Sequence, residues 1–215
     1  MPTESFQFGA LDANCHILFN EEDAVIIDPS DDTASLAGFA EAHGVRVRAL
    51  LLTHLHFDHA LGAASASELF KVKVYVGKED WDMREVLLGQ AGYFGFSVPR
   101  VFQAVPITEG RYMFGSLDLL AMKCPGHSPG SLCYYSQKER VVFSGDVLFF
   151  RSVGRSDLPG GDAEELEDSI RNKLYVLPEE TIVLCGHGEP TTIGDEMRKN
   201  MYCRARLSDR RQDHE

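Results

Sequence analysis

Several features that mark secreted or membrane proteins are absent from this sequence. No apolar run approaches the roughly 20 residues of a membrane-spanning helix. The N-terminus, Met1-Pro2-Thr3-Glu4-Ser5, lacks the basic and apolar regions of a signal peptide. Disulfide signals are missing too, because the cysteines are odd in number, widely spaced and form no C-x-x-C pair; they are Cys15, Cys124, Cys133, Cys185 and Cys203. A reduced, cytoplasmic compartment is therefore the expected location.

Positive charge is scarce as well. The chain has 21 basic and 33 acidic residues, a net charge of −12 at pH 7. Nucleic acids and anionic membranes bind basic surfaces, so we expect neither as a partner. Its 215 residues, 44% hydrophobic and 25% charged, suit one globular domain with a substantial core. We place this domain over residues 1–203 and a charged C-terminal tail over 204–215. The sequence indicates no oligomeric state.

Hydrophobic periodicity predicts strands alternating with helices. A hairpin over 14–28 precedes a helix that begins near Thr33 and ends at Gly44. Further strands are predicted at 72–76, 101–107, 112–114, 117–123, 132–135, 141–144 and 181–185, and further helices over 60–70, 78–88 and 162–174. Residues 89–99, rich in glycine and aromatics, are predicted to form a loop. This loop is either a flexible wall of a substrate cleft or a segment pinned to the surface by Phe94 and Phe96.

The densest group of metal-binding side chains follows the apolar run Ala49-Leu50-Leu51-Leu52, which reads as a buried strand. His54, His56, Asp58 and His59 come next. In an extended backbone alternate residues share a face, so the first three can point into one site, whereas Leu55 and Phe57 would face the core. A tightening of the chain at His59 could split the ligands between two neighbouring metals. Lone histidines are usually structural, but this spacing predicts a metal site.

Two later segments also hold polar side chains at strand ends. Pro125-Gly126-His127-Ser128-Pro129-Gly130-Ser131 fixes a turn that holds His127 off the end of a strand, where open α/β scaffolds present site residues. Asp146 follows the apolar strand at 141–144. A carboxylate there is costly to desolvate unless it is paired or bound to a metal.

These segments resemble a known family. Thr53-His54-Leu55-His56-Phe57-Asp58-His59 is similar to the T-H-x-H-x-D-H signature of the metallo-β-lactamase superfamily, and the turn at His127 and the later Gly186-His187-Gly188 resemble its other motifs. The run 154–161, G-R-S-D-L-P-G-G, resembles a loop of glyoxalase II-like hydrolases. The resemblance implies an α/β fold, a four-layer αββα sandwich. It also implies a short form without the C-terminal helical domain that supplies much of the glutathione site.

The same resemblance implies a ligand set. One metal is assigned His54, His56 and His127, and the other Asp58, His59 and His187, with Asp146 bridging. Two divalent metal ions are therefore expected. Zinc is the first choice, with iron or manganese possible, because no cysteine among the ligands enforces zinc.

The implied reaction is hydrolysis of an acyl thioester, similar to 2-hydroxyacyl-glutathione, by a hydroxide that the two metals share. A small-molecule thioester is the expected partner, and Asp58 is expected to orient the hydroxide as the catalytic residue. Tyr93, in the 89–99 loop, is the candidate substrate contact. Arg155 is interpreted as structural, paired with Asp157 or Asp162.

Two alternatives to this hydrolase stay open. One is a persulfide dioxygenase with a single iron, held by His54, His127 and Asp146. The other is a metal-binding protein without turnover.

Overall fold

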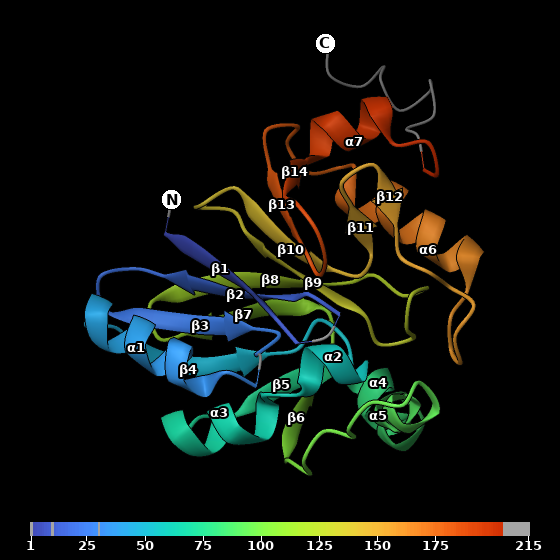
Figure 1. Cartoon of the computed structure of the whole chain (residues 1–215). Coiled ribbons are helices and arrows are strands. Elements are labelled where there is room, and N and C mark those ends of the chain that lie inside the picture. Colours follow the sequence, from blue (N-terminus) through green and yellow to red (C-terminus); the bar gives the residue numbers. More distant parts are fainter. Residues whose placement is uncertain (1, 10, 30, 204–215) are drawn as a thin grey trace.

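Two six-stranded β-sheets packed against each other form the centre of the molecule (Figure 1). The computed structural model describes residues 2–9, 11–29 and 31–203; the tail predicted over 204–215 lies outside them. The strands of the first sheet neighbour one another in sequence order, antiparallel from β1 to β3 and parallel from β3 to β6. They are β1 (Thr3–Phe8), β2 (Ala13–Phe19), β3 (Asp23–Ile27), β4 (Arg46–Leu51), β5 (Val74–Gly77) and β6 (Ala104–Ile107).

The second sheet has the strand order β14-β13-β10-β9-β8-β7. Its parallel pair, β10 and β13, lies beside antiparallel neighbours on both sides. Its strands are β7 (Gly110–Phe114), β8 (Leu117–Lys123), β9 (Leu132–Ser136), β10 (Val141–Gly145), β13 (Ile182–Cys185) and β14 (Thr191–Thr192). A short hairpin, β11 (Leu148–Phe149) with β12 (Ser152–Val153), follows β10.

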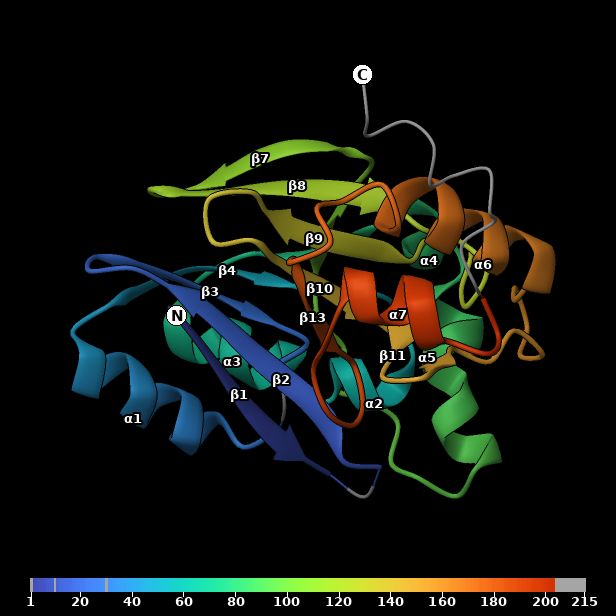
Figure 2. The same cartoon turned by 90° about the horizontal axis from the view of Figure 1, so that it is seen from above.

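Helices cover the outer face of each sheet, which gives the expected four-layer αββα sandwich. Figures 1 and 2 show α1 and α3 on one side of the molecule and α6 and α7 on the other. The first group is α1 (Thr33–His43), α2 (Phe57–Ala60), α3 (Ala63–Phe70), α4 (Lys78–Asp82) and α5 (Arg84–Tyr93). The second is α6 (Ala163–Ser169), the π-helix η1 (Ile170–Leu174) and α7 (Ile193–Lys199). None of the helices in the described ranges is long and apolar enough to cross a membrane.

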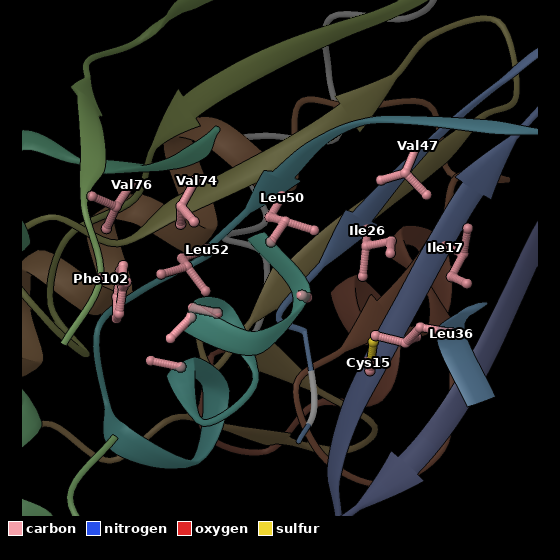
Figure 3. Packing of buried hydrophobic residues seen from close by; sticks show 14 of the residues in the cluster. Cys15, Ile17, Ile26, Leu36, Val47, Leu50, Leu52, Val74, Val76 and Phe102 are labelled. Atoms are coloured by element: carbon pink, nitrogen blue, oxygen red, sulfur yellow. The ribbon is translucent and has the colours of Figure 1, made fainter. Parts of the chain in front are cut away.

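Alternation along the strands explains why the first sheet is buried on both faces. Ile17 and Leu50 pack with the helices, whereas their neighbours Leu18 and Leu51 pack with the second sheet. Successive strand residues point to opposite faces, so a strand covered on both sides has to be apolar throughout. Figure 3 shows the helix-facing set, in which Leu36 of α1 lies beside the strand residues.

Most predicted elements are present, but three boundaries differ. The helix predicted over 60–70 begins only at Ala63, after the separate short helix α2. The helix predicted over 78–88 is interrupted at Met83, and its second part, α5, continues to Tyr93. Gly89 and Gly92 had favoured a loop there. Helix is formed nevertheless, because α5 buries side chains up to Ala91 and tertiary burial outweighs the low helix propensity of glycine. The strand predicted at 101–107 begins only at Ala104.

Candidate metal centre

The segment between β4 and α2 carries four of the candidate ligands. After an irregular stretch, α2 begins at Phe57 with His56 as its N-cap. His54 and His56 therefore precede the helix, whereas Asp58 and His59 lie in its first turn. The chain does tighten here, and Asp58 groups with His59 instead of sharing a face with His54 and His56.

The other candidate ligands follow strands of the second sheet. His127 lies in the turn between β8 and β9, Asp146 follows β10, and His187 follows β13. Because β10 and β13 are parallel neighbours, Asp146 and His187 leave the sheet at the same edge. Gly186 has to be glycine, since a Cβ atom there would lie 2.1 Å from Asp146 Oδ1.

The structure gathers these side chains into three overlapping sets, in each of which the ligand atoms lie within 4.8 Å of one another. The sets are His54, His56 and His127; Asp58, His59 and His187; and His54, His59 and Asp146. The first two have the same members as the two metal sites predicted from the sequence. Residues far apart in the chain therefore converge on one place, between the edges of the two sheets.

Backbone carbonyls orient the two histidines from the second sheet. His127 Nδ1 donates to the Arg155 carbonyl at 2.7 Å, and His187 Nδ1 donates to the Leu11 carbonyl at 3.0 Å. A carbonyl can only accept, so Nδ1 carries the proton in each ring. In the neutral ring Nε2 is then a lone pair, which is the form that binds a metal.

Asp28 orients His59 directly and His54 through Thr53. Its Oδ2 accepts from His59 Nδ1 at 3.0 Å and from the Thr53 hydroxyl at 2.7 Å, and its Oδ1 accepts from the Thr53 N–H at 2.7 Å. Because the Thr53 hydroxyl gives its proton to Asp28, it accepts from His54 Nδ1 at 3.0 Å. His54 and His59 therefore also present Nε2 to the site.

These Nε2 atoms face one another in pairs. His54 and His127 bring theirs to 3.3 Å, and His59 and His187 to 3.2 Å. Two lone pairs at such distances need a cation between them, and the N···N edge of a tetrahedral zinc site is also about 3.3 Å. Burial holds the pKa of His54 well below its usual value, which disfavours a proton in the first gap. Burial acts the same way on His59, but carboxylates led by Asp146 raise its pKa well above the usual value, so the second gap attracts positive charge.

Two further ligand atoms, His56 Nε2 and Asp146 Oδ1, are buried without a hydrogen-bond partner in the described part of the chain. Burial, then the charge of His127, lowers the pKa of His56 to about 3, so this ring is neutral. Asp146 lies between the histidine pairs, with Oδ1 3.3 Å from His59 Nε2 and Oδ2 3.6 Å from Nε2 of both His127 and His187. Burial opposes its ionisation, but the imidazoles, above all His59, hold the pKa of Asp146 well below its usual value. Neutral imidazoles around an ionised carboxylate fit divalent metal ions.

A cavity of about 330 Å³ opens onto these side chains. Apart from candidate ligands, it is lined by Leu11, Phe57, Gln90, Phe94, Phe96, Arg155 and Leu158. Phe57 stacks on Phe96, with ring centroids 5.1 Å apart. Phe57 is buried as predicted, and it also forms part of the cavity wall.

The structure does not place Tyr93, the predicted substrate contact, in this cavity. Tyr93 ends α5 with 87% of its surface exposed, and its ring lies against Phe94. Gln90, about one helical turn earlier, lines the cavity together with Phe94 and Phe96. The aromatic segment is therefore a wall of the cavity, but through other residues than the sequence suggested.

Arg155 has the structural role expected of it. Its guanidinium donates to both carboxylate oxygens of Asp157, each at 2.8 Å, while its carbonyl orients His127. Asp162, the other predicted partner, instead caps α6 by accepting from the N–H groups of Glu164 and Glu165.

Sequence reasoning missed Asp80, which is fully buried beneath the site. Asp80 accepts from the Leu55 N–H at 2.9 Å, the Ser128 hydroxyl at 2.8 Å and the Gly130 N–H at 2.6 Å. It thereby ties the segment that carries His54 and His56 to the turn that carries His127. Burial raises the pKa of Asp80, against these hydrogen bonds. No local pattern distinguishes this aspartate from the charged residues around it. Asp28, in contrast, follows an apolar strand as Asp146 does, and the same desolvation argument could have identified it.

Comparison with known proteins gives a consistent result. A family model for the metallo-beta-lactamase superfamily matches residues 8–187. The probable metallo-hydrolase YqgX of Bacillus subtilis is 34% identical over 197 residues, which cover 90% of this chain and 93% of the relative. The hydroxyacylglutathione hydrolase GloC of Haemophilus influenzae is 35% identical over 209 residues, which cover 94% of this chain and 98% of the relative.

Solved structures with the same fold include three of similar size. The BLEG-1 B3 metallo-beta-lactamase has a TM-score of 0.86 and 38% identity, covering 93% of this chain and 98% of its own. The di-iron-bound form of TTHA1623 has a TM-score of 0.83 and 37% identity, covering 93% and 99%. ETHE1 from Myxococcus xanthus has a TM-score of 0.77 and 25% identity, covering 94% and 84%.

Proposed function

Because the chain belongs to the metallo-β-lactamase superfamily, we propose that it is a metal-dependent hydrolase of acyl thioesters, 2-hydroxyacyl-glutathione among them. The proposal rests on two neighbouring clusters of candidate ligands, one of three histidines and one of two histidines and an aspartate, beside a cavity with several apolar lining residues. Likeness to a relative named as a hydroxyacylglutathione hydrolase supports the choice of substrate.

The residues present would hold two divalent metal ions. His54, His56 and His127 would bind one ion, Asp58, His59 and His187 the other, and Asp146 would contact both. Bound there, such ions act as Lewis acids and lower the pKa of water to about 7. Nitrogen and carboxylate ligands suit zinc, iron and manganese alike. A neighbour solved in a di-iron-bound form makes iron as reasonable a choice as zinc.

The chain's own groups orient the reactants. Asp58 lines the cavity, so its carboxylate can accept a hydrogen bond from the attacking water. The apolar walls exclude other water from the substrate. The water oxygen forms a new bond to the acyl carbon, the carbon–sulfur bond breaks, and the products are a carboxylic acid and a thiol. A thiol with a pKa of about 8.5 leaves readily as the thiolate.

The persulfide dioxygenase is the second candidate. A single iron held by two histidines and one carboxylate leaves positions open for oxygen, and His54, His59 and Asp146 form such a set here. His127, which the sequence had favoured in place of His59, also lies close to both partners, with its Nε2 3.3 Å from His54 Nε2 and 3.6 Å from Asp146 Oδ2. The structural likeness to ETHE1 from Myxococcus xanthus is the reason for retaining this candidate.

Protein loaded with zinc or iron and then offered each substrate separates the two candidates. Lactoyl-glutathione should release one thiol and one carboxylic acid per molecule without oxygen uptake. Oxygen consumption with glutathione persulfide, together with no cleavage of any thioester by the fully loaded protein, would replace the hydrolase by the dioxygenase. If the fully metal-loaded protein showed neither activity, the remaining interpretation would be a metal-binding protein without turnover. A β-lactam belongs in the same panel, because of the likeness to a B3 metallo-beta-lactamase.

A further inference from the structure

We propose that the cavity wall formed by α5 and residues 94–96 is a substrate subsite for an uncharged, apolar group that carries one hydrogen-bond acceptor, and that Gln90 recognises this acceptor. The inference rests on the proposed hydrolase function, which it extends to the part of the substrate that does not react.

Gln90 is the polar residue of this wall. Its side chain is only 9% exposed, and its Nε2 is buried without a hydrogen-bond partner among the described residues. A buried donor without an acceptor destabilises a folded protein, so each such group calls for an explanation. Nε2 is covered in this conformation, but Gln90 lines the cavity, so a rotation of its side chain would bring the donor to an acceptor bound there.

The position of Gln90 places this donor near the reacting centre. α5 packs against α2, the helix that carries Asp58 and His59. Asp58 and Gln90 line the same cavity, so one small molecule can contact both.

The rest of the wall is apolar. Phe57 and Phe96 stack on each other, and Phe94 exposes 43% of its surface beside them. Leu11 and Leu158 also line the cavity. Such surfaces favour a hydrocarbon or planar group, which removes them from water when it binds.

The charges of the lining disfavour an anionic group. Among the described lining residues, Arg155 carries the one permanent positive charge, and Asp157 already binds it through both carboxylate oxygens. A substrate carboxylate at the wall would therefore lose hydration without gaining a free cationic partner.

Two variants and one control test the subsite. Gln90→Met removes the amide but keeps an unbranched side chain, and Gln90→Glu keeps the shape but replaces the donor by a carboxylate. Gln137→Met, at an exposed position after β9, is the matched control. The substrates are thioesters of one uncharged thiol with butanoyl, 2-hydroxybutanoyl and succinyl groups, and acetyl thioesters of thiols with and without an amide.

Wild-type protein should prefer every uncharged substrate to the succinyl thioester. Gln90→Met should lower kcat/KM roughly 10-fold for the thioesters that place an acceptor at the wall, and less than about 2-fold for the others. Whether the acyl or the thiol series responds identifies the half of the substrate that lies there. The melting temperature of Gln90→Met should not fall, because the variant removes an unsatisfied donor.

The subsite would be refuted if Gln90→Met changed kcat/KM equally for all substrates or for none of them. A lower melting temperature together with the same loss of kcat/KM for every substrate would also refute it. A separate measurement keeps this failure distinct from failure of the hydrolase. Non-hydrolysable thioether analogues of every substrate in both series are titrated by calorimetry, and those that carry the acceptor should bind Gln90→Met about 10-fold more weakly than wild type. If wild type cleaves no thioester but this difference in binding is found, the subsite stands and the reaction is wrong.

Discussion

Replacing Asp28 by asparagine should weaken both metal sites, one directly through His59 and the other through Thr53 and His54. Asp28 Oδ2 accepts from His59 Nδ1 and from the Thr53 hydroxyl, which keeps the His59 proton on Nδ1 and leaves Nε2 free. An asparagine that keeps its oxygen towards the Thr53 N–H turns its amide NH₂ towards His59. His59 then has to accept through Nδ1, and the proton of the neutral ring moves to Nε2. The ligand atom of His59 is thereby blocked. The Thr53 hydroxyl faces the same NH₂, so it accepts there and donates to His54 Nδ1, which moves the proton of His54 to Nε2 as well.

The size of the effect follows from the role of such hydrogen bonds. Loss of a group that orients a metal-binding histidine typically weakens metal affinity 10- to 100-fold, which corresponds to about 1.4–2.7 kcal/mol. We expect this loss at the set Asp58, His59 and His187 and, through His54, at the set His54, His56 and His127. The backbone at position 28 should be unaffected, because asparagine tolerates its left-handed φ of 51° as well as aspartate does.

Cobalt or zinc titration of metal-free protein, followed by elemental analysis after dialysis, measures the two affinities separately. Wild type should retain two ions per chain, and Asp28→Asn should bind both ions 10- to 100-fold more weakly. Asp82→Asn, an exposed carboxylate that pairs with Lys78, is the control and should retain two. Two ions bound by Asp28→Asn with wild-type affinity would refute the assignment of tautomers and the metal role of His59 with it.

Three further changes test other parts of the structure. Asp146→Ala should lose both metal ions and activity more completely than any single histidine change, since it removes the carboxylate between the clusters; elemental analysis that finds both ions and near-normal turnover would contradict this. Gly186→Ala should lower metal content and melting temperature, because its Cβ would overlap Asp146 Oδ1, whereas Gly89→Ala, with nothing within 4 Å, should not. At Asp23, burial raises the pKa but hydrogen bonds from Ser116 and Arg48 outweigh it and lower the pKa to about 2. The contribution of its charge to the free energy of unfolding is therefore nearly complete above pH 4 and is lost as the pH falls towards 2. Asp23→Asn should lower the free energy of unfolding of metal-free protein, measured in urea, by about 2 kcal/mol at pH 7 and by little at pH 2. An equal loss at both pH values would show that charge is not the cause.

Strands, helices and the first candidate ligands could be predicted because their signals are local, whereas the four-layer fold and His187 were implied by the resemblance to the family. Continuous apolar runs predict strands buried on both faces, and Gly44 ends α1 in the left-handed conformation expected of it, with φ of 65°. His54, His56, Asp58 and His59 stand within one short segment, so their spacing alone indicates a metal site. His127 and Asp146 were identified from the turn and the strand end that hold them.

Contacts between distant segments were decided only by the tertiary structure. Asp28 reaches His59 across 31 positions, and Asp80 reaches Gly130 across 50. No periodicity encodes such pairs, because each depends on which strand ends meet at the edge of the sheets. The identity of the cavity wall was decided in the same way: packing of α5 against α2 extends the helix through two glycines, turns Gln90 inward and leaves Tyr93 in solvent. The sequence by itself therefore determined which side chains could bind metal, whereas packing between layers determined how they are oriented and what surrounds them.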